Sequence, residues 1–296
     1  MKRFIPTRLF VIVLMLLLTV SLIPAAIGCD REAETTGKTV VAVTILPQAG
    51  FVEAIGGDKV EVVVMVPPGA SPHTYEVTPD QMTRLSNAKM YAKVGSPVEF
   101  ELAWMDKLIA VNKSMLVVDC SKGINLTDSQ DPDEPGLDPH IWLSVKNAKI
   151  MVQNICDGLV QVDAANKAYY EENCAAYSEE LTKLDGDLTE DLSSVKNRSF
   201  IVFHPAFGYF AHDYNLKQIG VEQEGKEPDA DYIVRLIEEA KKSDIRVVFV
   251  SPQYSTKRAE SIAKEIGGKV VIIDPLAKEF IDNMHAIESA MKQAMQ

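Results

Sequence analysis

The chain has 296 residues, and its 42 acidic side chains outnumber its 30 basic ones, so the formal net charge at pH 7 is −12. A surface of this sign repels phosphate and attracts cations, which argues against a nucleic acid as partner. The four cysteines include no Cys-x-x-Cys pair, which argues against a metal site built from thiolates.

Residues 1–28 have the pattern of a signal peptide. Basic residues precede an apolar run that, at fewer than about 20 residues, is too short for a membrane-spanning helix. Small residues then lead to Gly28 and Cys29, as in the lipid-attachment signal of bacterial lipoproteins, although Ala26 stands where Leu is usual. We expect Cys29 to carry a lipid and residues 29–38 to form a flexible spacer. Ordinary secretory cleavage near Ala25 or Ala26, which would leave Cys29 as a spare thiol, is the alternative.

The remaining part, about 260 residues, exceeds the usual size of a single hydrophobic core, so we expect two lobes. The first lobe covers residues 39–143. Its clearest helix begins at Thr78, where Thr78 and Gln81 form a capping box and Pro79 takes the first helical position. Runs rich in β-branched residues predict buried strands at Thr39–Leu46, Val60–Val66, Lys89–Val94 and Met115–Asp119. The alternation of strands and helices predicts a parallel sheet.

Residues 144–197 are predicted to be helical. An apolar stripe from Val145 to Leu159 predicts one helix, and an apolar seam from Tyr177 to Val195 lies within a mostly charged second helix, from about Ala165 to Lys196. At about 1.5 Å per residue the second helix would reach about 45 Å, the length of a strut between two lobes. A coiled-coil partner face is the alternative, which the short length of the seam disfavours.

Two cysteines, Cys156 and Cys174, lie in these two predicted helices. They could pair if the helices pack together. Buried small residues are the preferred interpretation.

The second lobe covers residues 198–296, where the alternation of strands and helices resumes. Amphipathic patterns predict helices at 208–214, after Asp229, at 259–266 and from Phe280 to Met291. Strands are predicted at Ser199–Phe203, Ile245–Val250 and Lys269–Ile273. The expected fold is therefore α/β, with two lobes that each contain a mainly parallel sheet with flanking helices, joined by one long helix.

Three histidines and one aspartate lie beside prolines at nearly even intervals of 64 to 70 residues: His73, His140, His204 and Asp274. Neutral imidazole is the commonest protein ligand for a divalent transition metal, and three imidazoles with one carboxylate suit four-coordinate zinc. His204 and Asp274 follow predicted strands, at the edge where open α/β sheets bind ligands. Because the other two come from loops of the first lobe, we expect the metal between the lobes.

Two acidic residues flank the predicted ligands. Asp138 lies two residues before His140, and Glu76 lies three residues after His73. Either carboxylate could hold an imidazole N–H and so orient the ring toward the metal. Either could equally be a simple cap.

The segments around these residues resemble the signature segments of the zinc/manganese solute-binding proteins of ABC importers. The resemblance implies two lobes joined by a rigid helix, and a divalent cation that is held between them and delivered to a membrane permease. It also implies ligands at His73, His140, His204 and Asp274, with zinc favoured over manganese because His rather than Glu stands at the third position. The matching segments are Pro72-His73-Thr74-Tyr75-Glu76, Asp138-Pro139-His140-Ile141-Trp142-Leu143-Ser144, His204-Pro205-Ala206-Phe207-Gly208-Tyr209-Phe210 and Ile273-Asp274-Pro275-Leu276.

The chain departs from many zinc members between His73 and His140. Those members often carry a loop there that is rich in both histidine and acidic residues, whereas this chain supplies the acid without the histidine. The acidic residues are Asp128, Asp131, Asp133, Glu134 and Asp138.

These features favour a non-catalytic binding protein, monomeric and lipid-anchored on the outer face of the cell membrane, or periplasmic in a cell with two membranes. A zinc-dependent hydrolase is the alternative from another class. It would leave one metal position open for water, but the chain has no His-Glu-x-x-His segment or other hydrolase motif. An adhesin with a structural metal is a third reading.

Overall fold

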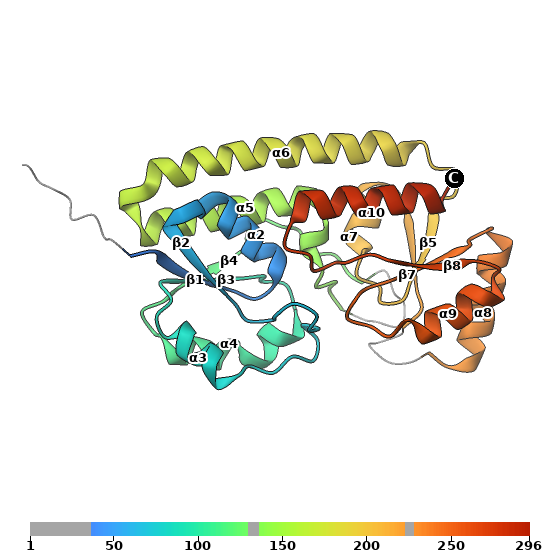
Figure 1. The fold of residues 1–296 in the computed structure, drawn as a ribbon, viewed down its shortest axis with the longest axis horizontal. Coiled ribbons are helices and arrows are strands. Elements are labelled where there is room, and N and C mark those ends of the chain that lie inside the picture. The colour runs from blue at the N-terminus through green and yellow to red at the C-terminus, as the bar shows by residue number, and fades with distance from the viewer. Residues whose placement is uncertain (1–36, 130–135, 223–227) are drawn as a thin grey trace, which may run out of the picture. The chain divides into compact units, whose positions relative to one another are not determined.

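The computed structural model describes residues 37–129, 136–222 and 228–296 (Figure 1). The predicted signal peptide, Cys29 and the acidic residues 131, 133 and 134 therefore lie outside the described residues. None of the helices in the described ranges is long and apolar enough to cross a membrane.

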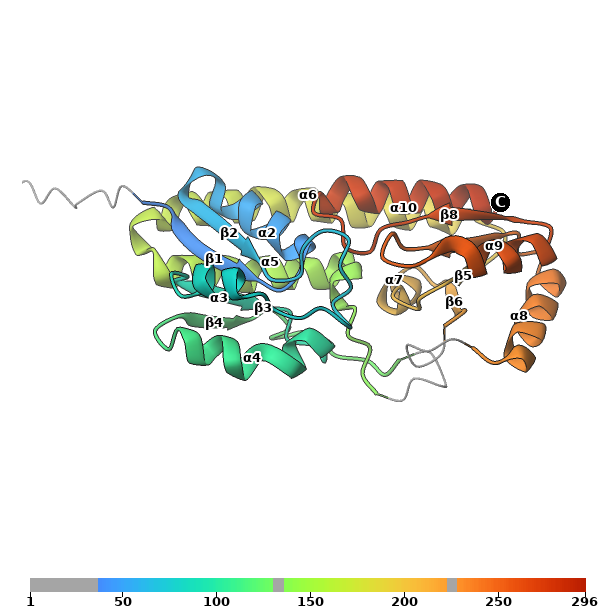
Figure 2. The same cartoon turned by 60° about the horizontal axis from the view of Figure 1, so that its bottom comes forward.

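The first half contains a four-stranded parallel sheet in the order β2-β1-β3-β4. Helices α2 and α5 lie on one face, and α3 and α4 lie on the other, as Figures 1 and 2 show. Coverage on both faces explains why the strands are nearly continuous apolar runs. The bounds are β1 Thr39–Val43, α2 Leu46–Gly56, a 3-10 turn Gly57–Lys59, β2 Val60–Val64, α3 Pro79–Leu85, β3 Met90–Lys93, α4 Glu99–Val111 and β4 Leu116–Asp119.

The second half contains a parallel sheet with the same order of connection, β6-β5-β7-β8. Side chains alternate between its two faces: Phe200 and Val202 point into one hydrophobic core, and Ile201 points into another. The bounds are β5 Ser199–Val202, α7 Gly208–Asp213, β6 Lys217–Gly220, α8 Ala230–Lys242, β7 Val247–Val250, α9 Thr256–Glu265, β8 Lys269–Ile272 and α10 Phe280–Ala294.

The predicted long helix is confirmed as α6, Lys167–Ser193, whose 27 residues correspond to about 40 Å. Before it lie a 3-10 turn Ile141–Leu143, α5 Val145–Val162 and a 3-10 turn Ala164–Asn166. Helix α6 packs against α2 and α5 of the first half and against α10 of the second (Figure 1). One continuous core therefore includes the α6 leucines and side chains from both sheets. The predicted fold class is confirmed.

Local expectations differ in their outcome. The capping box is confirmed: the Gln81 N–H donates to Thr78 Oγ1 at 3.3 Å, and the Thr78 N–H donates to Gln81 Oε1 at 3.0 Å. Strand β1 ends at Val43 rather than Leu46, because α2 begins at Leu46 with Pro47 in its first turn. Strand β6 was not predicted, since Lys217–Gly220 contains no run of β-branched residues and forms a sheet edge.

Candidate metal centre

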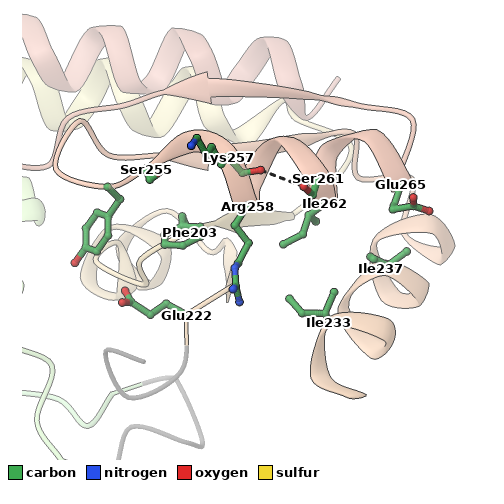
Figure 3. A pocket seen from close by; sticks show the side chains of 11 residues that line it. Phe203, Glu222, Ile233, Ile237, Ser255, Lys257, Arg258, Ser261, Ile262 and Glu265 are labelled. Atoms are coloured by element: carbon green, nitrogen blue, oxygen red, sulfur yellow. Dashed lines mark hydrogen bonds between the residues drawn. The ribbon is translucent and has the colours of Figure 1, made fainter. Parts of the chain in front are cut away.

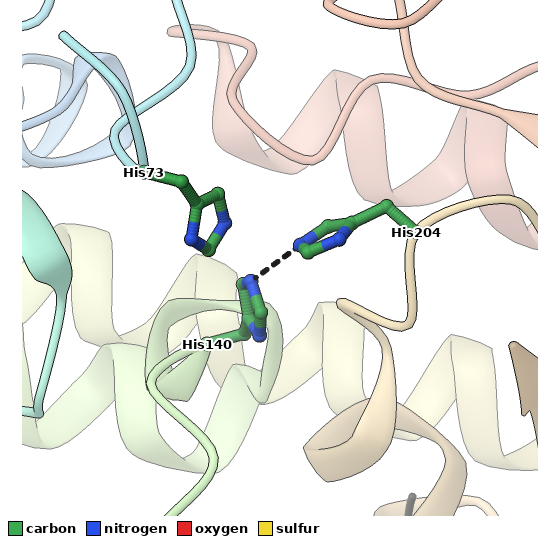
Figure 4. A group of neighbouring side chains, drawn as sticks. All are labelled: His73, His140 and His204. Atoms are coloured by element: carbon green, nitrogen blue, oxygen red, sulfur yellow. Dashed lines mark hydrogen bonds between the residues drawn. The ribbon is translucent and has the colours of Figure 1, made fainter. Parts of the chain in front are cut away.

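The three predicted histidines meet in space. His73 follows β2, His140 follows β4 and His204 follows β5, so each comes after the carboxyl end of a parallel strand. One ring nitrogen from each lies within 4.8 Å of the other two. Figure 4 shows the rings converging from three separate segments of the chain.

The spacing of the nitrogens suits a small metal ion. Nε2 of His140 lies 3.2 Å from Nε2 of His204, and the ring centroid of His73 lies 4.7 Å from that of His204 and 5.7 Å from that of His140. Zinc–nitrogen bonds of about 2.0 to 2.1 Å in a tetrahedral shell place two ligand nitrogens about 3.3 Å apart. The His140–His204 pair already has this separation.

Each imidazole has a carboxylate oxygen within hydrogen-bonding distance of its Nδ1 atom. Nδ1 of His73 lies 2.8 Å from Glu99 Oε2, and Nδ1 of His140 lies 2.8 Å from Asp138 Oδ1. Nδ1 of His204 lies 2.9 Å from Glu222 Oε2. A carboxylate accepts the Nδ1 proton and leaves the lone pair of Nε2 for a metal. The arrangement therefore sets both the orientation and the tautomer that metal binding requires.

The three histidine–carboxylate pairs differ in how far they are buried. The side chains of His140 and His204 are 5% and 6% exposed, whereas His73 is 22% exposed and its partner Glu99 is 51% exposed. Burial, together with the neighbouring rings of His140 and His73, holds the pKa of His204 well below its usual value. His204 is consequently neutral at pH 7, the form that binds metal.

Aromatic and apolar groups enclose the inner side of the centre. The Tyr254 ring stacks on His204 at 5.2 Å, and the Trp142 ring meets His140 edge-on at 5.3 Å. The indole N–H of Trp142 donates to the Pro275 carbonyl at 2.8 Å, which ties the two halves together beside the rings. The three histidines line an inner pocket of about 20 Å³, enough for one ion or water. They also line an outer cavity of about 830 Å³.

The other predicted site residues occupy different positions. Asp138 Oδ1 contacts Nδ1 of His140 and also accepts the backbone N–H of His140 at 2.9 Å, and its role in orienting a metal ligand stays a prediction. Glu76 is exposed, and the carboxylate on His73 is Glu99 instead. Asp274 is not a member of the three-histidine group among the described residues. Its Oδ1 accepts from the Leu276 N–H at 2.9 Å and from Gln253 Nε2 at 3.2 Å. As a fourth ligand Asp274 therefore stays a prediction.

The sequence did not single out Glu99 or Glu222. Glu99 begins α4, 26 residues from His73, and Glu222 comes two residues after β6, 18 residues from His204. Recognition of β6 as a strand of the second sheet would have placed Glu222 at the same edge as His204.

A second cavity, of about 770 Å³, lies between α8 and α9 (Figure 3). It shares Glu222 and Tyr254 with the outer cavity of the metal centre. Its walls combine apolar side chains such as Ile233 and Ile262 with the charges of Lys257 and Arg258. No histidine or cysteine is among the described residues that line it, so it does not extend the metal centre.

Comparison with known proteins places this geometry in a family. A family model described as the periplasmic component A of the zinc-uptake complex, ZnuA, matches residues 41–294. The chain belongs to this family. The high-affinity zinc uptake system protein ZnuA of Bacillus subtilis is 30% identical over 279 residues, which cover 88% of this chain and 87% of that protein.

Three further similar proteins are a longer relative and two solved structures. The zinc-binding lipoprotein AdcA of Streptococcus pneumoniae is 29% identical over 265 residues, 84% of this chain, but the chain spans only 52% of the length of AdcA. A crystal structure of ZnuA is 40% identical, with a TM-score of 0.84, and covers 88% of this chain and 100% of that one. The laminin-binding protein of Streptococcus agalactiae, at 23% identity, a TM-score of 0.80 and coverage of 88% of this chain and 100% of that one, shares the fold.

Proposed function

We propose that the chain is the extracytoplasmic solute-binding component of an ABC importer and that it binds zinc as cargo. One observation carries the proposal: one ring nitrogen from each of the three imidazoles converges, and a carboxylate accepts from each Nδ1. The names of the Bacillus and Streptococcus relatives, a zinc uptake protein and a zinc-binding lipoprotein, support the same cargo.

Zinc is favoured over manganese by the donor set. Zinc is borderline-soft and suits a tetrahedral shell with nitrogen ligands, while manganese prefers oxygen ligands and higher coordination. Three nitrogens from His73, His140 and His204 fit zinc, and we propose Asp274 as the fourth ligand. In that case Asp274 must lie closer to the three imidazoles when metal is bound, since it is not a member of the described group whose ligand atoms lie within 4.8 Å of one another.

We propose no catalytic role. A zinc hydrolase needs a general base beside a metal-bound water. The three carboxylates that contact the rings, Glu99, Asp138 and Glu222, are occupied at Nδ1, on the side of each ring away from the converging Nε2 atoms. Carboxylates in these positions orient the imidazoles for metal binding and are not placed to act as a general base on a metal-bound water.

The partner and location follow from the same proposal. A cargo protein of an importer must meet a membrane permease, and one relative is named a zinc-binding lipoprotein. We propose that a lipid on Cys29 anchors the chain to the outer face of the cell membrane and that the chain acts as a monomer. Mass spectrometry of membrane-extracted protein checks the lipid.

Metal analysis tests the proposed cargo. Protein purified without chelator is expected to contain about one zinc per chain, and zinc is expected to displace manganese when both are offered. If the protein retained manganese in preference to zinc, the cargo would be manganese instead of zinc. Absence of both metals from folded protein, with no binding on addition, would contradict the proposal.

A further inference from the structure

Helices α5 and α6 lie side by side in opposite directions, joined by a short turn (Figure 1). Each contributes one cysteine to their interface. Cys156 on α5 is 2% exposed and Cys174 on α6 is 3% exposed, and both are thiols in the structure.

The two thiols face each other across this interface. The Cys156 thiol donates to the Tyr170 carbonyl at 3.6 Å, and Tyr170 lies one helical turn before Cys174. The Cys174 thiol in turn donates to Gln153 Oε1 at 3.9 Å, and Gln153 lies about one turn before Cys156. Each sulfur therefore contacts the turn of the neighbouring helix that carries the other sulfur. The neighbouring Cys174, together with burial, raises the pKa of Cys156.

We propose that Cys156 and Cys174 form a disulfide bond between α5 and α6 in the exported protein. The proposal rests on the extracytoplasmic location in the proposed function, because disulfides persist in oxidising compartments. Cys120 is buried elsewhere, with Gln48 Nε2 3.5 Å from its sulfur, and stays a thiol.

The reaction is a thiol–disulfide exchange with a disulfide oxidant, either an oxidoreductase or oxidised glutathione. The thiolate of one cysteine attacks the oxidant's disulfide, and the second thiolate then attacks the mixed disulfide. The S–S bond of the protein forms, the S–S bond of the oxidant breaks, and two protons and two electrons pass to the oxidant, which leaves as two thiols. Because both sulfurs are buried, the exchange takes place during folding or through local opening of the two helices.

The bond would fix the start of the long helix. Helix α5 begins five residues after His140, and α6 is the helix that contacts both halves. A covalent link between them constrains the unfolded chain and holds the register of α6 against the first half.

Peptide mapping tests the bond directly, because Lys149, Lys167 and Lys183 place the two cysteines in separate tryptic peptides, 150–167 and 168–183. The full chain, exported through its own leader, is unfolded in N-ethylmaleimide and digested. We expect the two peptides to be joined and unalkylated, while Cys120, in peptide 114–122, is alkylated. Alkylation of both Cys156 and Cys174 in folded, exported protein would overturn the proposal.

A second measurement separates the bond from the location and from zinc binding. Chain produced in the cytoplasm and treated with oxidised glutathione is expected to form the same joined peptides, whether or not it binds zinc. If the joined peptides did not form under these oxidising conditions, the two cysteines would not be placed to form a disulfide, and the proposal would be overturned whatever the location of the protein. Reductant is expected to lower the melting temperature of the parent and of Cys120→Ser by about 5 °C. Reductant should leave the melting temperature of the double variant, Cys156→Ser with Cys174→Ser, unchanged. If reductant lowered the melting temperature of this double variant as much as that of the parent, the result would contradict the bond.

Discussion

The three carboxylates of the metal centre differ in burial, and this difference decides how firmly each can hold its histidine. Glu99 is half-exposed, so water competes for its oxygens, whereas Asp138 and Glu222 are buried. Burial alone would raise the pKa of Glu99, but the hydrogen bond and charge interaction with His73 lower it overall. The buried carboxylates work in a lower dielectric, where a hydrogen bond is stronger.

Replacing Glu222 tests this role. Glu222→Gln keeps the size of the side chain but removes the charge that holds the Nδ1 proton of His204, so zinc affinity is expected to fall about 10- to 100-fold. Calorimetric titration measures the change. Glu76→Gln, at an exposed position in the same loop as His73, is the matched control and should bind like the parent. Equal affinity of the two variants would show that Glu222 does not position the ring.

Protons compete with zinc for the imidazoles, which makes binding pH-dependent. A histidine with the ordinary pKa of about 6.5 charges as the pH falls toward 5, and a charged ring cannot bind metal. The pKa of His204 is held well below this value by its burial and by the neighbouring rings of His140 and His73, so His204 needs a lower pH than an ordinary histidine to gain a proton. Zinc affinity is expected to fall with acid, with fewer than three protons displaced per zinc near pH 6.

Titrations in buffers of different ionisation enthalpy count these protons. An affinity that does not change between about pH 7.5 and 5 would point to a site dominated by carboxylates.

Helix α6 is the element that joins the two sheets through a shared core. Its buried leucines, Leu181, Leu184, Leu188 and Leu192, contact a core that includes Phe200 and Phe249 of the second sheet. Its opposite face is exposed and largely charged. The stability of α6 therefore comes from packing rather than from local sequence.

A core truncation on α6 measures this packing. Leu184 is 1% exposed, so Leu184→Ala is expected to lower the free energy of unfolding by about 2 to 5 kcal/mol in urea. Glu179→Ala, on the exposed face of the same helix, should change it by less than about 0.5 kcal/mol. Similar small effects of both substitutions would mean that α6 does not share the core.

Elements with a strong periodic pattern were predictable, and those defined by their partners were not. The seam of α6 and the capping box of α3 are local patterns, so the sequence alone was sufficient. Strand β6 is a short edge strand, and only pairing with β5 makes it a strand. The same reason applies to the site: proline-marked histidines stand out in the chain, whereas Glu99 and Glu222 gain their role only when the fold brings them to His73 and His204.

At the scale of the whole described unit, the metal centre bridges the segments on either side of α6. His73 and His140 precede α6 in the chain, and His204 follows it. The hydrogen bond from the Trp142 indole to the Pro275 carbonyl joins the same two halves beside the histidine rings, and the continuous hydrophobic core also joins them. A frame with shared packing of this kind limits the freedom of the three imidazoles, which lowers the cost of ordering them around a metal.

Calorimetric zinc titration of His140→Ala tests the central claim most directly, with His212→Ala, exposed on α7, as the matched control. The structure predicts that His140→Ala loses more than about 100-fold in zinc affinity while His212→Ala binds like the parent. His73→Ala, at a less buried position, provides a second test if the first variant unfolds, and the same loss is expected. Zinc binding as tight as the parent's in a folded His140→Ala or His73→Ala variant would contradict the assignment of the three histidines as the metal centre.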